Sequence, residues 1–345
     1  MGLIRWPGLI DVHVHLRDPG ATHKEDFTTG SRAAVAGGFT FIIDMPNNPL
    51  PTISITRLLK KIKLSRIKSV CNKGFHYGTE GHNLPSFSKA WKNKHVFGLK
   101  VYCNHTTGNP LIEDKKLLDR VFGMWKTEKP ILVHAEDDKI DYILFLSQKY
   151  RRRVHVCHIA TQSQLETVRK TVKHYDRISI GVTPQHLFLT EVERKQLGNF
   201  GIVKPTIKSK KDQNALWEGI YDRTISVVES DHAPHTLLEK LSDQPPFGMP
   251  GLESTLGLLL KAVHDRRIKL ERVKYLLYDS PQHIFSIPKQ AETFIEFDPE
   301  RSYFLAGREL ETKCGWSPFS GWKLYGKVER EVVHDKTLVK EGRMI

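Results

Sequence analysis

The segment "LIDVHVH" at residues 9–15 carries two histidines two positions apart in an otherwise apolar run. Residues two apart in a strand project to the same face, so His13 and His15 can bind one metal ion. Two polar residues on a solvated strand face are the alternative interpretation of this pair alone. Protein interiors accept such groups only when each has a partner, so the rest of the chain must supply those partners.

Further candidate metal ligands follow in the chain. His134, His158 and Asp231 each lie at or near the end of another apolar segment. Imidazoles combined with a carboxylate suit zinc, and a site left open to water would be catalytic rather than structural. Four imidazoles exceed what one catalytic zinc uses, so this set of donors favours two metal ions.

Lys100 interrupts the apolar segment 96–103. A buried ammonium is costly unless it is paired or neutralised, although a lysine at a strand end can also extend its amine to solvent. Two neighbouring divalent cations would repel an ammonium, whereas a carbamate formed with carbon dioxide is an anion that can bridge both. We therefore expect Lys100 to be carboxylated.

Apolar segments that predict strands alternate with amphipathic segments that predict helices over most of the chain. The expected strands are residues 9–15, 39–45, 96–103, 130–135, 153–160, 177–183 and 224–231. The expected helices cover residues 28–38, 55–67, 138–150, 161–175 and 254–265. This alternation predicts an α/β fold, with a closed (β/α)8 TIM-like barrel as the leading form. An open doubly wound sheet is the alternative, but the Gly-rich phosphate-binding fingerprint that would favour it is missing.

A barrel of this kind would gather the metal donors, because the carboxyl ends of its strands meet on one face. From about residue 296 the pattern changes to short β-like pieces with no helices between them. We therefore divide the chain into a barrel, residues 1–295, and a small C-terminal β appendage, residues 296–345.

Charge and composition bound the class of protein. The 345 residues include 53 Lys and Arg against 39 Asp and Glu, a formal net charge of +14. The basic runs at 58–68 and 148–156 are typical of solvated helix faces or strand borders, and no nucleic-acid-binding motif accompanies them, so we expect no nucleic-acid partner. No apolar run has the length of a membrane span, and the first residues lack a secretory pattern. We expect a cytoplasmic protein whose four cysteines are reduced.

Eight motifs in order resemble a known family. They are "PGLIDVHVHLRDPG", "MPNN", "GLKVY", "VHAE", "VHVCHIA", "HLFLT", "SDHAPHT" and "PGLE". Together they resemble dihydroorotases of the amidohydrolase superfamily, in particular the dihydroorotase domain of the multifunctional animal pyrimidine-synthesis protein. The resemblance implies a metal-dependent amidohydrolase barrel that catalyses the zinc-dependent, reversible cyclisation of N-carbamoyl-L-aspartate to L-dihydroorotate in de novo pyrimidine biosynthesis.

The resemblance also implies the cofactors and the catalytic residue. The cofactors are two Zn²⁺ ions and the carbamate on Lys100. The ligands are His13, His15, carboxylated Lys100 and Asp231 for one ion, and Lys100, His134 and His158 for the other. Asp231 would accept the proton from the nucleophile and pass it to the departing ring nitrogen.

Arg17 is a candidate for binding the substrate. It lies two residues beyond His15, where its planar guanidinium can grip a carboxylate with two hydrogen bonds. An ion pair with Asp18 or Glu25 is the alternative interpretation. The further substrate-binding residues that the resemblance implies are Asn47, His235, Thr106 and Lys204. Of these, Thr106 lies in a segment, 104–110, that resembles the family's mobile loop.

Three positions depart from the pattern of the family. Gly181 and Gln185 stand where members often have a glutamate and a histidine. Some relatives are thought to use that glutamate, together with the cysteine that matches Cys157, for a further metal ion, so a third ion is doubtful here. Lys204 stands where an arginine or asparagine is usual, and a lysine lacks the planar fork.

Two other functions remain open. A catalytically silent dihydroorotase-like scaffold for aspartate transcarbamoylase would usually lose metal ligands, whereas this chain keeps the full set. A hydantoinase or allantoinase would use the same metal centre, but its ring has no carboxylate for Arg17 and Asn47 to bind. We therefore expect an active enzyme with a small-molecule substrate. A homodimer and an aspartate transcarbamoylase partner are further expectations.

Overall fold

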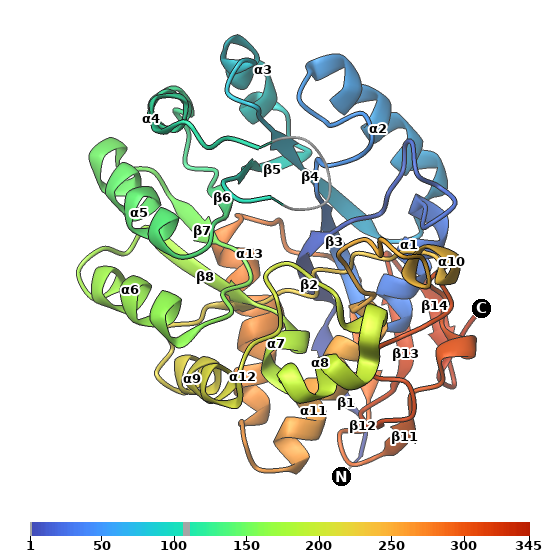
Figure 1. The fold of residues 1–345 in the computed structure, drawn as a ribbon. Coiled ribbons are helices and arrows are strands. Elements are labelled where there is room, and N and C mark those ends of the chain that lie inside the picture. The colour runs from blue at the N-terminus through green and yellow to red at the C-terminus, as the bar shows by residue number, and fades with distance from the viewer. Residues whose placement is uncertain (1, 106–110) are drawn as a thin grey trace.

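An eight-stranded parallel sheet forms the centre of the molecule (Figure 1). The computed structural model describes residues 2–105 and 111–345. In chain order, which is also their order around the sheet, the strands are β2 (Leu9–Val14), β3 (Phe39–Asp44), β4 (Asn72–Gly78), β5 (Val96–Tyr102), β6 (Ile131–His134), β7 (Val154–Val156), β8 (Ile178–Val182) and β9 (Val227–Val228). A parallel bridge between Val14 and His232 brings the first and last strands together. The expected (β/α)8 barrel is confirmed.

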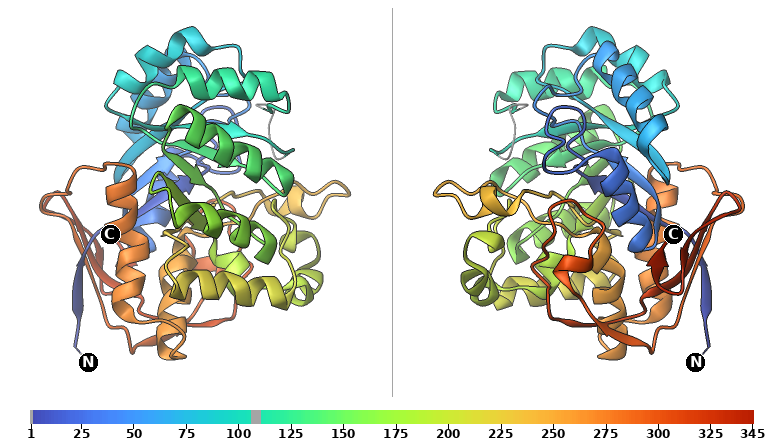
Figure 2. Two further views of the ribbon diagram at one scale, coloured as in Figure 1. Left: turned by 90° about the vertical axis from the view of Figure 1, so that its left-hand side faces the viewer. Right: turned by 90° about the vertical axis from the view of Figure 1, so that its right-hand side faces the viewer.

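Helices cover the outside of the barrel, as the side views show (Figure 2). They are α1 (Phe27–Ala36), α2 (Ile55–Lys68), α3 (Phe87–Lys92), α4 (Lys115–Met124), α5 (Asp138–Tyr150), α6 (Gln162–Val172), α7 (Pro184–Phe188), α8 (Glu191–Leu197), α9 (Lys210–Tyr221), α10 (Leu237–Lys240), α11 (Leu252–His264), α12 (Leu270–Lys274) and α13 (Ser280–Ile284). Asp26, Ser54 and Thr161 cap α1, α2 and α6 by accepting backbone N–H groups of the first turn. Within the described ranges, no helix is long and apolar enough to cross a membrane.

The barrel strands are buried on both faces. Every residue of β2, β3 and β5 is buried, because one face of each strand points into the barrel and the other lies under the helices. This double burial explains the continuous apolar runs in the sequence. It also means that each polar side chain on these strands needs a partner inside the protein.

Strand β4 is the one barrel strand that the sequence analysis missed. Its sequence, Asn-Lys-Gly-Phe-His-Tyr-Gly, lacks an apolar run. Gly74 is required there because a Cβ atom would lie 2.3 Å from the ring of Phe97. His76 points into the barrel, and its Nε2 lies 2.9 Å from the carbonyl oxygen of Val12. A glycine and a buried histidine, bonded among the described residues through its Nε2 alone, thus replace the aliphatic residues by which strands are usually recognised.

A second, antiparallel sheet takes strands from both ends of the chain. Its order is β1 (Ile4–Pro7), β10 (Phe294–Phe297), β13 (Val328–Val333), β14 (Lys336–Lys340) and β15 (Arg343–Met344). The strands β11 (Ser302–Phe304) and β12 (Lys323–Tyr325) pair separately. In Figure 2 the dark blue N-terminal strand lies beside the red C-terminal strands. The β appendage is therefore present, with an added N-terminal strand, while the division of the chain at residue 295 stays a prediction.

Lys61 corrects one part of the sequence analysis, which assigned the basic residues of 58–68 to a solvated face. The side chain is fully buried on α2. Its Nζ lies 2.6 Å from Asp44 Oδ2 and donates to the carbonyl oxygen of Met45 at 2.7 Å and to Asn48 Oδ1 at 2.8 Å. Asp44 Oδ1 in turn accepts the backbone N–H of Leu16 at 2.9 Å. This polar cluster anchors α2 to the ends of β2 and β3.

Replacing Lys61 with methionine should lower the free energy of unfolding by about 3–5 kcal/mol, because the Asp44 carboxylate would lose its buried counter-ion. Lys60→Met, at the exposed neighbouring position of the same helix, should change it little. Urea unfolding of both variants beside the wild type measures the difference. Equal effects at the two positions would contradict the role of the buried pair.

Candidate active site

His13, His15 and Asp231 meet at the carboxyl end of the barrel. The ring centroids of the two histidines are 5.4 Å apart. Asp231 Oδ1 lies 3.4 Å from His13 Nε2 and 3.1 Å from His15 Nε2. Burial opposes ionisation of Asp231, but the neighbouring histidines, above all His13, outweigh it and hold the pKa of the carboxyl below its usual value. Two nitrogens and one oxygen therefore converge from the first and last strands of the barrel.

The hydrogen bonds of His15 show that a cation fits this position. Its Nδ1 lies 2.7 Å from Asn47 Oδ1, a carbonyl oxygen that only accepts, so Nδ1 carries the proton. Burial lowers the pKa of His15 to about 4, so the ring is neutral at pH 7. The remaining nitrogen, Nε2, then presents a lone pair to a carboxylate oxygen that presents lone pairs too. A metal ion between them would satisfy both groups.

His134 and His158 form a second candidate group. His134 Nδ1 and His158 Nε2 face each other at 3.0 Å, and the ring of His158 lies 5.1 Å from that of His13. Within the described part of the chain, the other two nitrogens, His134 Nε2 and His158 Nδ1, have no hydrogen-bond partner. Burial lowers the pKa of His134 to about 3 and that of His158 well below its usual value. Both rings are therefore neutral and suited to bind a divalent ion.

Lys100 is fully buried on β5. Its Nζ contacts Cys157 Sγ at 3.1 Å and lies 5.0 Å from the centre of the Tyr102 ring. No carboxylate of the described residues forms an ion pair with it. A buried amine is costly without a partner for its charge, and the described residues place only a thiol and an aromatic ring beside this one.

The sequence analysis missed Glu229, a carboxylate within the same cluster. The side chain is fully buried. Burial would raise its pKa, but the adjacent His13 and His155 hold that pKa well below its usual value. Glu229 and Asp231 lie two positions apart, like His13 and His15. This spacing is a signal in the sequence that could have identified the residue.

Three residues of the site have left-handed backbone conformations. The φ angles are 61° at Arg17, 32° at His158 and 47° at Asp231. Such angles are uncommon for residues other than glycine and cluster where function constrains the chain. The strands β2, β7 and β9 end two or three residues before these positions, earlier than the sequence patterns predict. The chain turns there and directs the side chains across the mouth of the barrel.

The residues expected to bind substrate mostly share one cavity at this mouth. It is lined by His15, Arg17, Asn47, Val203, Lys204, Asp231, Ala233, Phe247 and Gly248. The Nζ of Lys204 lies 5.6 Å from the centre of the Phe247 ring. Thr106 and residues 107–110 lie outside the described residues. Two candidate metal ligands (His15 and Asp231), two cationic side chains (Arg17 and Lys204) and the amide of Asn47 therefore line the same cavity.

Arg17 forms neither of the ion pairs considered as alternatives. Asp18 pairs with Lys68 at 2.6 Å, and Glu25 accepts the backbone N–H of Lys313 at 3.3 Å. The Nε–H of Arg17 donates to the carbonyl oxygen of Pro234 at 3.3 Å, and no carboxylate of the described residues pairs with the guanidinium. It is buried and lines the cavity. The side chain is thus placed to receive an anion.

His235 supports Arg17 from the side. Its Nε2 lies 3.2 Å from Arg17 Nη2 and 3.0 Å from the carbonyl oxygen of Phe247, and its Nδ1 lies 3.2 Å from Lys24 Nζ. Burial and the two cations lower the pKa of His235 to about 2, so the ring is neutral. Contact between His235 and substrate stays a prediction.

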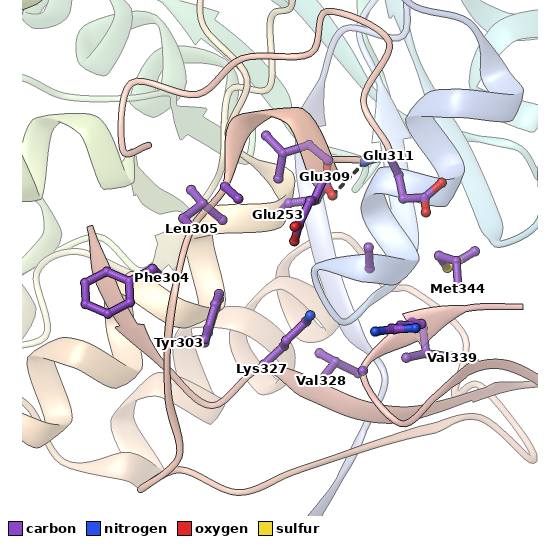
Figure 3. Close-up of a pocket in the computed structure, with 15 residues that line it drawn as sticks. Glu253, Tyr303, Phe304, Leu305, Glu309, Glu311, Lys327, Val328, Val339 and Met344 are labelled. Carbon is purple, nitrogen blue, oxygen red and sulfur yellow. Dashed lines mark hydrogen bonds between the residues drawn. The ribbon is translucent and has the colours of Figure 1, made fainter. Parts of the chain in front are cut away.

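A separate pocket lies between α11 and the β appendage (Figure 3). Its volume is about 480 Å³. Glu253 in its wall accepts the backbone N–H groups of Glu311 at 2.9 Å and Thr312 at 3.1 Å, and burial raises its pKa to about 8. No histidine or cysteine is among its lining residues. The candidate active site is therefore chosen by the chemistry of its side chains rather than by the size of the hollow.

His186 fixes the segment that carries Lys204. Its Nδ1 lies 2.6 Å from Thr183 Oγ1, and its Nε2 lies 3.1 Å from the carbonyl oxygen of Pro205. Burial lowers the pKa of His186 to about 4, although the carbonyl of Pro205 opposes the shift. The folded protein therefore takes up this proton at a lower pH than the unfolded chain does.

His186 should consequently make stability depend on pH. Its contribution is complete above pH 6.5 and is lost as the pH falls towards 4, by about 3 kcal/mol in all. The difference in unfolding free energy between the wild type and His186→Gln should shrink by that amount between pH 7 and pH 4. The exposed His174→Gln serves as the control. A difference that does not change with pH would contradict the assignment.

Comparison with known proteins gives the family. Residues 4–243 match the model of the amidohydrolase family. The chain is 39% identical over 348 residues to the multifunctional protein CAD of Squalus acanthias, covering 99% of this chain but only 15% of that protein. It is 30% identical over 367 residues to the dihydroorotase of Pyrococcus abyssi, covering 100% of this chain and 85% of the relative.

Solved structures show the same fold. An L-hydantoinase from Arthrobacter aurescens superposes with a TM-score of 0.94 at 21% identity, over 99% of this chain and 86% of that one. An inactive dihydroorotase-like domain of a CAD-like protein from Chaetomium thermophilum superposes with a TM-score of 0.84 at 24% identity, over 100% and 97%. These matches agree with the barrel and its attached sheet. From the family match and the curated relatives, the chain belongs to the amidohydrolase family and is one of its dihydroorotase-like members.

Proposed function

We propose that the chain is an active dihydroorotase, which interconverts N-carbamoyl-L-aspartate and L-dihydroorotate. The observation that carries this proposal is Arg17: a buried guanidinium, unpaired with any described carboxylate, shares a cavity with His15 and Asp231. A cyclic amide that bears a carboxylate would place its carboxylate at Arg17 and its amide beside His15 and Asp231. The 30% identity to a dihydroorotase over 85% of its length supports the proposal.

The donor set supports two Zn²⁺ ions and a carbamate on Lys100, which these residues would hold. We assign His13, His15 and Asp231 to one ion, His134 and His158 to the other, and Lys100 to both. The neutral imidazoles and the lone pairs that face Asp231 fit this arrangement. When bound, such ions lower the pKa of a water molecule and polarise the amide carbonyl.

The chain's own residues would orient the substrate and move the proton. Arg17 binds the carboxylate of the ring, assisted by Asn47, Lys204 and His235, and Thr106 is a further candidate outside the described residues. In hydrolysis, the C–N bond of the ring amide breaks as a C–O bond forms. Asp231 takes the proton from the attacking water and delivers it to the ring nitrogen, and the reverse sequence closes the ring.

A silent scaffold for aspartate transcarbamoylase is the second candidate, because an inactive dihydroorotase-like domain has the same fold. The chain spans about 15% of the multifunctional relative, so such a partner and a homodimer are proposals only. The complete set of donors favours activity over silence. A hydantoinase-type activity is less well supported, because its substrate leaves Arg17 without an anion.

The decisive experiment is an assay of purified protein reconstituted with zinc and bicarbonate, with the metal content measured on the same sample. We expect about two zinc ions per chain, as a binuclear centre requires, and hydrolysis of dihydroorotate that is faster than that of hydantoin or allantoin. Zinc-loaded protein without turnover of any of these rings would indicate the silent scaffold. Faster opening of hydantoin would refute the assignment of the substrate.

Substitution of Arg17 tests carboxylate recognition. Arg17→Ala should lower kcat/KM for dihydroorotate by about 2–5 kcal/mol, roughly 30- to 5,000-fold, because the substrate carboxylate loses its partner. Arg17→Lys keeps the charge but not the planar fork and should lose less. Arg57→Ala, on the exposed face of α2, is the matched control. Unchanged kinetics in Arg17→Ala with normal zinc content would exclude this role.

A further inference from the structure

Glu229 lies immediately behind the candidate metal ligands. Its Oε1 accepts the backbone N–H of His158 at 2.7 Å. Its Oε2 lies 3.2 Å from His155 Nε2 and 3.3 Å from His13 Nδ1. One buried carboxylate thus contacts the strand end that carries His158 and the ring of His13, which belong to different candidate metal groups.

The contacts of His13 resemble those of His15. His15 has its Nδ1 on Asn47 and its Nε2 towards Asp231. His13 has its Nδ1 beside Glu229 and its Nε2 towards the same aspartate. An acceptor behind a ligating histidine fixes which nitrogen carries the proton and how the ring is oriented, and it makes the other nitrogen a stronger donor. Glu229 lies behind His13 as Asn47 lies behind His15, but at an ion-pair distance rather than in a hydrogen bond.

Gly181 provides the space for this carboxylate. A Cβ atom at position 181 on β8 would lie 2.3 Å from Glu229 Oε1 and 2.6 Å from Glu229 Cδ. Any side chain there would displace the carboxylate from its contacts. The sequence resemblance expects a glutamate at position 181, and the chain instead has glycine on β8 and a glutamate on the neighbouring strand end, after β9.

We propose that Glu229 is the positioning residue of the metal centre, and that Gly181 is a glycine because its missing side chain leaves the place for the Glu229 carboxylate. Glu229 orients His13 through Nδ1 and holds the backbone of His158. Position 181 and position 229 therefore act as a pair, because a side chain at 181 and the carboxylate of Glu229 would need the same space. The inference rests on the metal centre proposed above.

Cobalt binding by the 345-residue chain tests the role without relying on activity. Titration of metal-free protein with Co²⁺, in bicarbonate and followed by visible absorption, gives the affinity and the number of ions. Glu229→Gln should weaken Co²⁺ binding about 10- to 100-fold, the usual loss when a partner of a ligating histidine is removed. Gly181→Ala should weaken it in the same way, because the new methyl group displaces the carboxylate.

A double-mutant cycle separates this mechanism from general damage. In a Glu229→Ala background, Gly181→Ala should cause little further loss of Co²⁺ affinity, since no carboxylate remains to be displaced. Glu331→Gln alters another fully buried glutamate, on β13. Gly74→Ala introduces a comparable clash, with Phe97 on β5. Both controls can lower stability but should leave the Co²⁺ affinity unchanged.

The outcomes are distinct. Wild type that binds no Co²⁺ overturns the proposed centre and the role of Glu229 together. Wild type that binds two ions, with an unchanged affinity in Glu229→Gln or additive losses in the cycle, overturns the role of Glu229 alone. The wild type could instead bind a further Co²⁺ ion that gives a thiolate charge-transfer band. If Glu229→Gln lost that ion, the positioning role of Glu229 would also be overturned, because Glu229 would then be a metal ligand beside Cys157. Coupled losses at 181 and 229 establish it.

Discussion

The whole site depends on how one carboxylate oxygen is surrounded. Asp231 Oδ1 faces the Nε2 atoms of His13 and His15 at 3.4 and 3.1 Å. In His15, the opposite nitrogen is occupied by Asn47 and burial keeps the ring neutral, so lone pairs face lone pairs. Such an arrangement is unfavourable in a dry interior unless a cation lies between the groups. The closed barrel produces this arrangement, because the two histidines lie on or just after its first strand and Asp231 follows its last strand.

Negative and positive side chains occupy different parts of the site. Glu229 lies among the histidines, with no exposure to solvent, whereas Arg17 and Lys204 line the cavity at the mouth. A cationic centre held between them would be neutralised from within and would face an entrance that attracts anions. The backbone strain at Arg17, His158 and Asp231 is compatible with this arrangement, because the surrounding strands and helices determine where those residues turn.

Local sequence patterns predicted most of the elements but not their limits. The alternation of apolar runs with amphipathic segments identified seven of the eight barrel strands. It missed β4, where Gly74 and His76 take the place of aliphatic residues. It also placed Lys61 on a solvated face, because helical periodicity cannot show that a particular lysine meets a buried aspartate from another strand. The N-terminal strand β1 joins β10 only through a contact between the two ends of the chain.

The sequence by itself determined the class of fold and the chemical types of the donors, since strand periodicity and the order of the motifs are properties of neighbouring residues. It also identified most residues that the structure brings to the mouth of the barrel, although their roles there stay predictions. Only the tertiary structure decided which nitrogen of each histidine is occupied, that Arg17 lacks a carboxylate partner among the described residues, and that Glu229 fills the space left by Gly181. These features depend on distances between residues far apart in the chain, which local periodicity does not encode.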